Sequence, residues 1–472
     1  MRDTGYEILD TRYGMRDKYP ISRIPYLVSS IQYPASSIQY PLSRILRPMQ
    51  LQVEASYKQI IRSALPISFA ILIPQLNYIT NNIFLGHYSQ QAMAVAGITG
   101  VYYLIFAAIG FGLNNGLQTL IARRAGENRP EEIGKIFNQG ILITLGIAAT
   151  GIIITWTIAP YVFGLFVAPE RLDDAVTFSK IRIWGLPFLY IYQMRNALLV
   201  GTNQSRYLAS GAIAEASANV LFDFLLIQGR WGFPEMGLNG AAVASIIAEF
   251  TGMFVVYMVI RKKGIAKRFQ LFKKLRPDRF NLMLIWTMSF PLIFQHAISV
   301  MTWEYFFLLN DAHGERALAI SNAMRNLFGF GGVIYWALAA TSNMMVSNII
   351  GQGKQELVWG LLKKLVRISS GLTLIVFLLF NLFPRLVLSI YGQDSDFVEQ
   401  AIPVLRIVSI AMLLQSASAI FLFAVTGSGN SRVTLLIEVF AIIMYTAYVY
   451  LVLDKYFLSI TYGWMSESIW RS

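Results

Sequence analysis

One pattern of apolar and small residues occurs twice in this chain, at a constant separation. The turn GTNQSR at 201–206 recurs as GSGNSR at 427–432, at the nearly equal separation of 226 residues. Anchors that keep one offset over so long a stretch indicate an internal duplication, even where few other residues agree. The chain is therefore predicted to fold as two similar halves. The matching anchors, each pair 225 residues apart, are Pro66 with Pro291, Phe69 with Phe294 and Gly126 with Gly351.

Between these anchors lie apolar runs of membrane-spanning length. A helix rises about 1.5 Å per residue and needs roughly 20 residues to cross the hydrocarbon. A mean hydropathy of +0.52 and a charged fraction of 14% exclude an ordinary soluble domain. We therefore predict an all-α polytopic membrane protein whose main partner is the lipid bilayer. The expected spans are 64–86, 92–120, 133–158, 178–201, 207–229, 238–260, 281–310, 317–347, 357–383, 400–425 and 433–453.

Symmetry predicts six spans in each half, but the second half supplies only five apolar runs of that length. The sixteen residues after Tyr456 include Glu467 and Arg471, and they are too short and too polar to cross a bilayer. We therefore expect two pseudo-symmetric six-helix bundles in which the last, twelfth helix is truncated or absent.

The chain begins with a polar stretch rich in Tyr and Pro, in which SSIQYPA is followed directly by SSIQYPL. We expect a disordered basic tail, or a leader upstream of a start at Met49; a tail that contacts anionic lipid is the alternative. The expected domains are a tail at 1–48, an N-terminal lobe of six helices at 49–260, a basic linker at 261–279 and a C-terminal lobe at 280–472.

Positive charge collects in alternate loops. Nine Lys and Arg residues lie between Arg261 and Arg279, whereas loops on the other side carry acids such as Asp173 and Asp394. By the positive-inside rule the N-terminus and the basic loops face the cytoplasm, in a multi-pass protein of the plasma (inner) membrane. The linker is expected to lie on the inner leaflet, with a regulatory role as the alternative. A net charge of +13 spread over short loops forms no nucleic-acid surface, so no nucleic-acid partner is expected.

Several chemistries are poorly supported by the composition. The chain has no Cys and three His, which excludes thiol catalysis and Cys-ligated metals and disfavours a His-built metal site. It also has neither an HExxH motif nor a glycine-rich phosphate loop. We therefore expect no enzyme and no cofactor.

A polar stripe in the fifth expected span is the most informative feature. Glu215, Asn219 and Asp223 are spaced four apart, which places them along one slowly turning helix face. An ionisable residue at membrane depth costs roughly 2.5 to 3.5 kcal/mol on insertion scales, so it needs a function or a partner. Burial disfavours the charged form of a carboxylic acid, which then binds and releases a proton near working pH. The alternative is a stripe that only holds helices together.

The two halves differ at equivalent positions. The first half is polar where the second is apolar or aromatic, which suggests a division of labour: an N-terminal lobe with the ion-coupling site and a C-terminal lobe with an aromatic wall for a lipophilic substrate. Rings in such a wall suit organic cations, although ordinary helix packing is the alternative. The equivalent positions under the repeat offsets are Gln75 and Val300, Asn81 and Phe306, Asn219 and Tyr445, and Asp223 and Val449. The aromatic wall also includes Trp303 and Phe307.

These residues resemble the multidrug and toxic compound extrusion (MATE) family, within the superfamily that includes lipid-linked oligosaccharide flippases. The similarity covers about residues 60–465. It rests on Pro66 with Gln75, the segments LGHYSQQAMAVAGI and ARRAGENRPEEIGK, the two turns GTNQSR and GSGNSR, and GLNGAAVAS at the sixth span. The resemblance implies two six-helix bundles that form a V, and export by alternating access driven by protons or sodium. We expect a monomer.

The resemblance also implies roles for single residues. Asn219 and Asp223 match an Asn and an Asp associated with proton or sodium coupling, and Ser245 stands where a Thr hydroxyl is common. Asn81 stands where the first helix is expected to carry an acid, so two-carboxylate coupling is not carried over. Gln415 lies near the position of an acid in the tenth helix of the sodium-coupled branch, whose site is not carried over either.

The sequence thus predicts an ion-coupled antiporter that exports small, often cationic, lipophilic compounds. A flippase for a lipid-linked precursor is the alternative, with Arg195 and Arg325 as the cations for its headgroup. The coupling ion is H+ or Na+, with Asp223 and Asn219 as the sodium ligands in the second case. The predicted ion-coupling residues are Asp223, Asn219, Asn81, Ser245 and Glu215; the predicted substrate cavity contains Gln75, Phe306, Phe307, Trp303, Tyr445 and Gln415.

Overall fold

The structure, a computed structural model, describes residues 50–273 and 276–471. The predicted tail at 1–48 lies outside these residues. The described part is helical throughout, without strands, and ten of its helices are long and apolar enough to cross a membrane. The prediction of an all-α polytopic membrane protein is confirmed. The helices are α1 (Tyr57–Tyr88), α2 (Gln90–Gly126), α3 (Pro130–Phe166), α4 (Pro169–Arg182), α5 (Leu186–Gly201), α6 (Leu208–Leu226), α7 (Gly237–Lys262), α8 (Ile265–Arg268), α9 (Arg279–Asp311), α10 (Glu315–Gly351), α11 (Val358–Leu382), α12 (Pro384–Ser389), α13 (Ser395–Ser428), α14 (Ser431–Val449), α15 (Ile460–Gly463) and α16 (Ser466–Arg471).

One expected span is not a single helix. The run 178–201 is divided between α4 and α5 by a 3₁₀ turn at Ile183–Gly185, and a proline stands in the first turn of α5. Proline fits the first turn of a helix without cost, because the N–H that it lacks has no partner within the helix there. Ten long helices are therefore present in the described residues instead of the eleven spans predicted.

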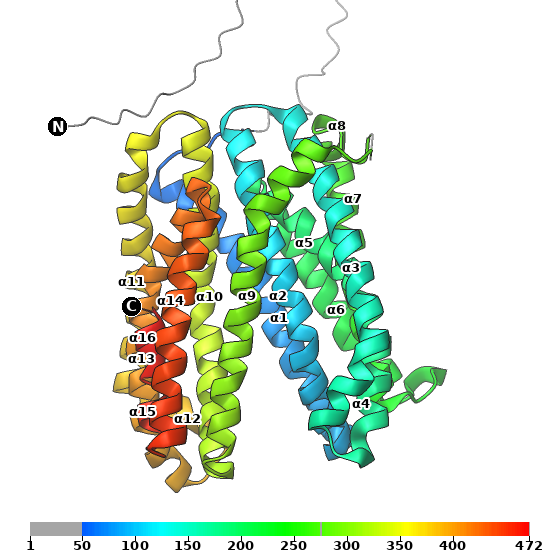
Figure 1. Cartoon of the computed structure of the whole chain (residues 1–472), viewed down its shortest axis with the longest axis vertical. Helices are drawn as coiled ribbons and strands as arrows, with labels where there is room; N and C mark the ends of the chain where they lie inside the picture. The colour runs from blue at the N-terminus through cyan, green and yellow to red at the C-terminus, as the bar shows by residue number, and fades with distance from the viewer. Residues whose placement is uncertain (1–49, 274–275, 472) are drawn as a thin grey trace, which may run out of the picture. The chain divides into compact units, whose positions relative to one another are not determined.

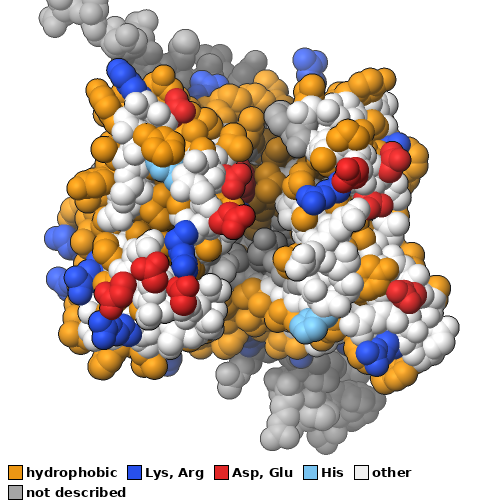
Figure 2. Space-filling model, turned by 90° about the horizontal axis from the view of Figure 1, so that it is seen from below, with side chains coloured by type: hydrophobic (Ala, Val, Ile, Leu, Met, Phe, Trp, Pro, Cys, Tyr) orange, Lys and Arg blue, Asp and Glu red, His pale blue; other side chains and the backbone are white. Residues whose placement is uncertain are grey.

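The helices form two groups within residues 50–471. The N-lobe comprises α1 to α7 and the C-lobe comprises α9 to α16, with α2 and α9 side by side between them (Figure 1). The basic connections α2–α3, α7–α9, α10–α11 and α13–α14 share one end of the molecule, which we call the basic end. Seen from the opposite end, the surface is hollowed between the two groups, with hydrophobic side chains along parts of the walls (Figure 2).

The lobes meet closely at the basic end, where α2 crosses α10. Gly126 lies directly against the carbonyl of Asn348, and Gly351 lies against the carbonyl of Arg123. Both contacts leave no room for a side chain, so glycine is required at each position. The two glycines are repeat anchors 225 residues apart, and so are their partners. The two lobes therefore make equivalent contacts, in which the glycine of each lobe packs against a carbonyl of the other.

A short extended segment covers this contact. We call Gln50–Ala55 the strap, because it crosses from one lobe to the other ahead of α1. The Asn348 amide donates to the carbonyl of Leu51 at 3.0 Å and to that of Ala122 at 3.2 Å, and its oxygen accepts from the Val53 N–H at 3.1 Å. One fully buried side chain on α10 thus joins the strap and both lobes.

The variant Asn348→Ala is expected to loosen the basic end. Buried groups left without their partners cost about 1 to 3 kcal/mol, which shifts a two-state equilibrium by roughly tenfold or more. Because the chain has no cysteine, Ser347→Cys is a single reporter at this buried contact. Its thiol should react about tenfold faster in the Asn348→Ala background. Asn310→Ala, which removes a buried amide bonded only within α9, should leave the rate unchanged. Equal labelling rates in all three proteins would refute the role of Asn348.

The chain after α14 does not cross the C-lobe again within the described residues. It passes through a π-helical turn, Tyr450–Lys455, and then folds back so that α15 and α16 pack on α13 and α14. The fold-back buries Trp464 and Glu467 completely. The sequence prediction that these residues are too polar to span agrees with this course.

Candidate functional site

Three predicted ion-coupling residues meet between α1 and α6. Asp223 and Asn219 lie one helical turn apart on α6 and are almost fully buried. With its amide oriented to satisfy both of its atoms, Asn81 of α1 donates to Asp223 Oδ2 and to Asn219 Oδ1, the latter at 2.7 Å. The spacing of four on α6 thus presents a carboxylate and an amide together to one residue of α1.

The second oxygen of the carboxylate is not engaged. Asp223 Oδ1 is buried and has no hydrogen-bond partner among the described residues. A buried carboxylate oxygen without a partner is costly, and binding a proton or a cation removes that cost. Asn219 and Asn81 supply further amide oxygens and N–H groups beside it. The site therefore has the chemistry for a proton, and the hard oxygen ligands that Na+ prefers.

The other two predicted coupling residues lie outside this cluster. Ser245 is half-buried on α7, and no hydrogen bond joins it to Asp223, Asn219 or Asn81 in the part of the chain that is described. Glu215 lies eight residues before Asp223, roughly 12 Å along the helix. Its side chain packs on Gly252 of α7 and lies near enough to Glu249 for the two acids to repel each other. The predicted single stripe on α6 is therefore divided between two sites.

Glu249 belongs to a buried ion pair that the sequence analysis missed. Arg182 donates to both carboxylate oxygens of Glu249, to Oε2 at 3.0 Å and to Oε1 at 2.5 Å, and Tyr103 donates to Oε1 at 3.0 Å. The guanidinium also lies 3.8 Å from the centre of the Tyr103 ring. This cluster joins α2, α4 and α7.

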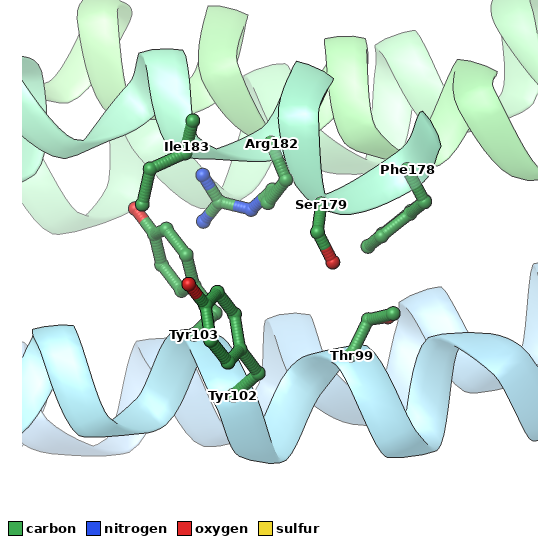
Figure 3. Close-up of a pocket in the computed structure, with 7 residues that line it drawn as sticks. All are labelled: Thr99, Tyr102, Tyr103, Phe178, Ser179, Arg182 and Ile183. Carbon is green, nitrogen blue, oxygen red and sulfur yellow. The ribbon is translucent and has the colours of Figure 1, made fainter. Parts of the chain in front are cut away.

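The break between α4 and α5 places Arg182 in this position. Figure 3 shows side chains from α2 reaching toward others from the end of α4 and the turn after it, around a pocket that leaves no room for a water molecule. Gly185 in the turn lies against Arg182 and Glu249, where a side chain would not fit. Arg195, which the sequence offered as a headgroup cation for the flippase alternative, bonds the carbonyl of Met253 with its guanidinium and faces the ring of Tyr257.

The predicted aromatic wall is a closed cluster in this conformation. Phe306 and Tyr445 are completely buried, and Phe307 nearly so. Trp464 from the fold-back packs edge-on against Phe306, with ring centres 5.1 Å apart, while Trp303 donates to Glu467 at 3.1 Å. These rings therefore do not face open space here. Trp464 and Glu467 gave no sequence signal, because they follow the last apolar run.

A cation already lies on part of this wall. The Arg325 guanidinium is 4.8 Å from the Trp303 ring centre and 4.7 Å from that of Phe307, and it donates to Glu304 at 2.9 Å. Arg325, the second cation named for the flippase alternative, thus pairs with a half-buried acid. The rings can hold a cation, and in this conformation the cation is the protein's own.

The two predicted glutamines occupy different environments. Gln75 on α1 is exposed, and its side-chain oxygen reaches toward Gly329 of α10 across the space between the lobes. Gln415 on α13 is buried, and its side-chain oxygen has no hydrogen-bond partner within the described ranges. Gln75 alone of the two lies where a molecule between the lobes would meet it.

The equivalent positions of the two halves meet in the same way. Asn81 and Asn219 contact one another in the N-lobe, and their counterparts Phe306 and Tyr445 have ring centres 6.4 Å apart in the C-lobe. The repeat offset read from the sequence therefore holds in space. One lobe places polar groups where the other places rings.

Comparison with known proteins explains this duplication. The MatE family model matches residues 66–225 and again 291–451, which together make up more than half of the chain. The chain belongs to the MatE family. The two matches start 225 residues apart, the offset found in the sequence. The prediction of a duplicated MATE protein is confirmed.

Several known proteins are similar to this chain at low sequence identity. A probable multidrug resistance protein NorM from Thermotoga maritima is 23% identical over 424 residues, covering 88% of this chain and 90% of the relative. A NorM from Halalkalibacterium halodurans is 26% identical and covers 62% and 65%. A solved structure described as the outward-facing conformation of a multidrug resistance MATE family transporter has a TM-score of 0.82 at 17% identity, covering 91% and 95%. A transporter of the MOP superfamily from Pyrococcus furiosus gives 0.81 at 17%, covering 90% and 94%.

Proposed function

We propose that this MatE protein is an ion-coupled antiporter that exports small, often cationic, lipophilic compounds by alternating access. The observation that carries the proposal is the cluster of Asn81, Asn219 and Asp223, a buried carboxylate with one oxygen unengaged at membrane depth. Such a group in a membrane protein marks an ion pathway more often than a structural contact. The names of the NorM relatives support multidrug export.

The closed basic end supports the proposed direction of transport. If that end faces the cytoplasm, as the positive-inside rule predicts for a plasma-membrane protein, the hollow between the lobes opens outward. A proton or sodium ion entering from outside would reach Asp223 and favour the inward-facing arrangement, and substrate would then bind between the lobes near Gln75. We propose that one chain performs this cycle as a monomer.

The alternative of a lipid-linked flippase has less support. A pyrophosphate headgroup needs several cationic side chains in the central space. The two candidates are engaged elsewhere, since Arg195 bonds the carbonyl of Met253 and Arg325 bonds Glu304. We therefore retain export of small molecules as the proposed function.

Purified protein in proteoliposomes tests the proposal. A fluorescent organic cation should be transported against its gradient when a proton or sodium gradient is imposed, and not when both gradients are absent. The reason is that movement of the dye against its gradient needs the free energy released when the coupling ion moves down its own gradient. Transport of the dye that is independent of both gradients, or translocation of a fluorescent pyrophosphate-linked lipid in its place, would contradict antiport and favour the flippase.

A further inference from the structure

A cavity of about 240 Å³ opens at the basic end, between the lobes. It lies where α2, α9 and α10 meet the turn between α13 and α14. One water occupies about 30 Å³ of liquid, so the space holds a group the size of a phosphate with room beyond it. Neither the ion-coupling cluster nor the hollow at the opposite end includes these residues.

The lining is positively charged. Arg123 comes from the N-lobe and Arg432 from the C-lobe, and no acidic side chain among the described residues lines the cavity. Arg432 is exposed and forms no ion pair or hydrogen bond within the described residues. Arg123 donates to the carbonyl of Ser428 at 2.9 Å, while its Nε is buried and has no partner in the same part of the chain. Glu127 interacts electrostatically with Arg123, but its carboxylate pairs with Arg124 at 2.7 Å.

The polar groups around the two arginines are mainly donors. The cavity includes the start of α14, where Asn430 is the N-cap and Ser431 the first helical residue. The Asn430 side chain accepts from the Val433 N–H at 3.4 Å, and the other N–H groups of the first turn lie beside it. Four N–H groups at a helix start lack partners within the helix and attract anions. Thr287 adds a hydroxyl from α9. Arginine side chains, hydroxyls and a helix start together match the oxygens of a phosphate group.

The duplication shows what occupies the equivalent place in the N-lobe. The counterpart of Arg123 is Asn348, and the counterpart of the turn 427–432 is 201–206. There the strap binds Asn348, and Asn203 of that turn donates to the carbonyl of Gln50 at 3.4 Å. In the N-lobe copy, the neutral peptide groups of the strap thus lie against the neutral side-chain amide of Asn348.

The second copy is built differently. The described residues of the chain that precede α9 bind α3 instead, where Asn138 donates to the carbonyl of Lys273 and Gln139 to that of Arg276, both at 2.9 Å. The cavity beside Arg123 is therefore not filled by a strap of its own. A cation replaces the neutral amide at the same position, so a negatively charged group suits the second site.

We propose that this cavity binds a phosphate group, held by Arg123, Arg432 and the start of α14. Because the two arginines belong to different lobes, the bound anion would join the lobes and favour the closed basic end. The chemistry is shared by the headgroup of an anionic phospholipid and by a free phosphate. The proposal is independent of the identity of the exported compound and of the coupling ion.

The test compares melting temperatures of the purified full chain in two settings. Nanodiscs of phosphatidylcholine are compared with nanodiscs that also contain phosphatidylglycerol, and detergent-solubilised protein is compared with and without inorganic phosphate. Wild type should melt higher with the anion, by about 2 °C or more. A rise in the nanodiscs alone assigns the site to a lipid headgroup, and a rise in detergent as well assigns it to phosphate in general.

Two matched variants decide whether the rise belongs to the cavity. Arg432→Gln removes an exposed guanidinium and should fold normally but lose the rise. Arg206→Gln removes its repeat counterpart, also exposed and at the same end, and should keep the rise. An equal rise in Arg432→Gln, or no rise in wild type in either setting, would overturn the proposal. Native mass spectrometry should count more retained phospholipid on wild type and on Arg206→Gln than on Arg432→Gln.

Discussion

The variant Asp223→Asn is expected to fold and to lose gradient-driven export by roughly tenfold or more, because a neutral amide cannot bind and release the driving ion. The substitution keeps the size of the side chain and an oxygen that can accept from Asn81. Its effect should therefore fall on coupling and not on packing. The measurement is dye efflux from proteoliposomes under an imposed proton gradient and then a sodium gradient, with the melting temperature recorded for each protein.

Asp394→Asn is the matched control for this change. Asp394 is an exposed acid at the start of α13, and a hydrogen bond from Arg316 holds the pKa of this carboxyl below its usual range. The control should export like wild type, because it removes one carboxylate outside the membrane-spanning helices. Export by Asp223→Asn at the wild-type rate, under either gradient, would remove Asp223 from the coupling site.

The variant Glu249→Gln is expected to destabilise the protein by about 3 to 5 kcal/mol, since it leaves a buried guanidinium without its counter-charge. The two side chains of the pair are only 14% and 6% exposed. Tyr103 would also lose the carboxylate to which it donates. Three helices, α2, α4 and α7, would lose their shared polar contact. The measurement is the melting temperature of purified protein, which should fall by many degrees.

Removing both charges should be less harmful than removing one. The double variant Arg182→Leu with Glu249→Leu leaves no uncompensated buried charge, and such replacements are often close to neutral. Arg316→Ala, which breaks an exposed pair with Asp394, should leave the melting temperature almost unchanged, because solvent screens such pairs. If Glu249→Gln melted no lower than Arg316→Ala, the buried pair would have no structural importance.

Much of the architecture could be predicted because local sequence determines it. Apolar run length predicts spanning helices, and the constant offset between anchors predicts the duplication. The Asn219 and Asp223 pair was also visible, because a spacing of four places two side chains on one face. Asn81 was found through its place in the repeat, and its contact with both residues agrees with that reading.

Most of the features that were missed depend on tertiary contacts. The break after Arg182 falls inside an expected span, where Gly185 and Pro187 were a local signal that we passed over. The ion-pair partner of Arg182, Glu249, is 67 residues away and had no such signal. Glu215 follows the same periodicity as Asp223, yet the slow turn of the face directs it toward α7. The fold-back that buries Trp464 depends on its contacts with Phe306 of α9 and Ser321 of α10. Residues so distant in the sequence leave no local pattern that predicts these contacts.

The most direct test of ion coupling through Asp223 is counterflow of the ion itself. Proteoliposomes containing wild type or Asp223→Asn would be loaded with a pH-sensitive or a sodium-sensitive dye. Transport would be started by adding a lipophilic cation on one side of the membrane, with no proton or sodium gradient imposed. We expect wild type to move one of the two ions opposite to the substrate and Asp223→Asn to move neither. Substrate movement accompanied by equal ion counterflow in both proteins would contradict coupling through the cluster of Asn81, Asn219 and Asp223.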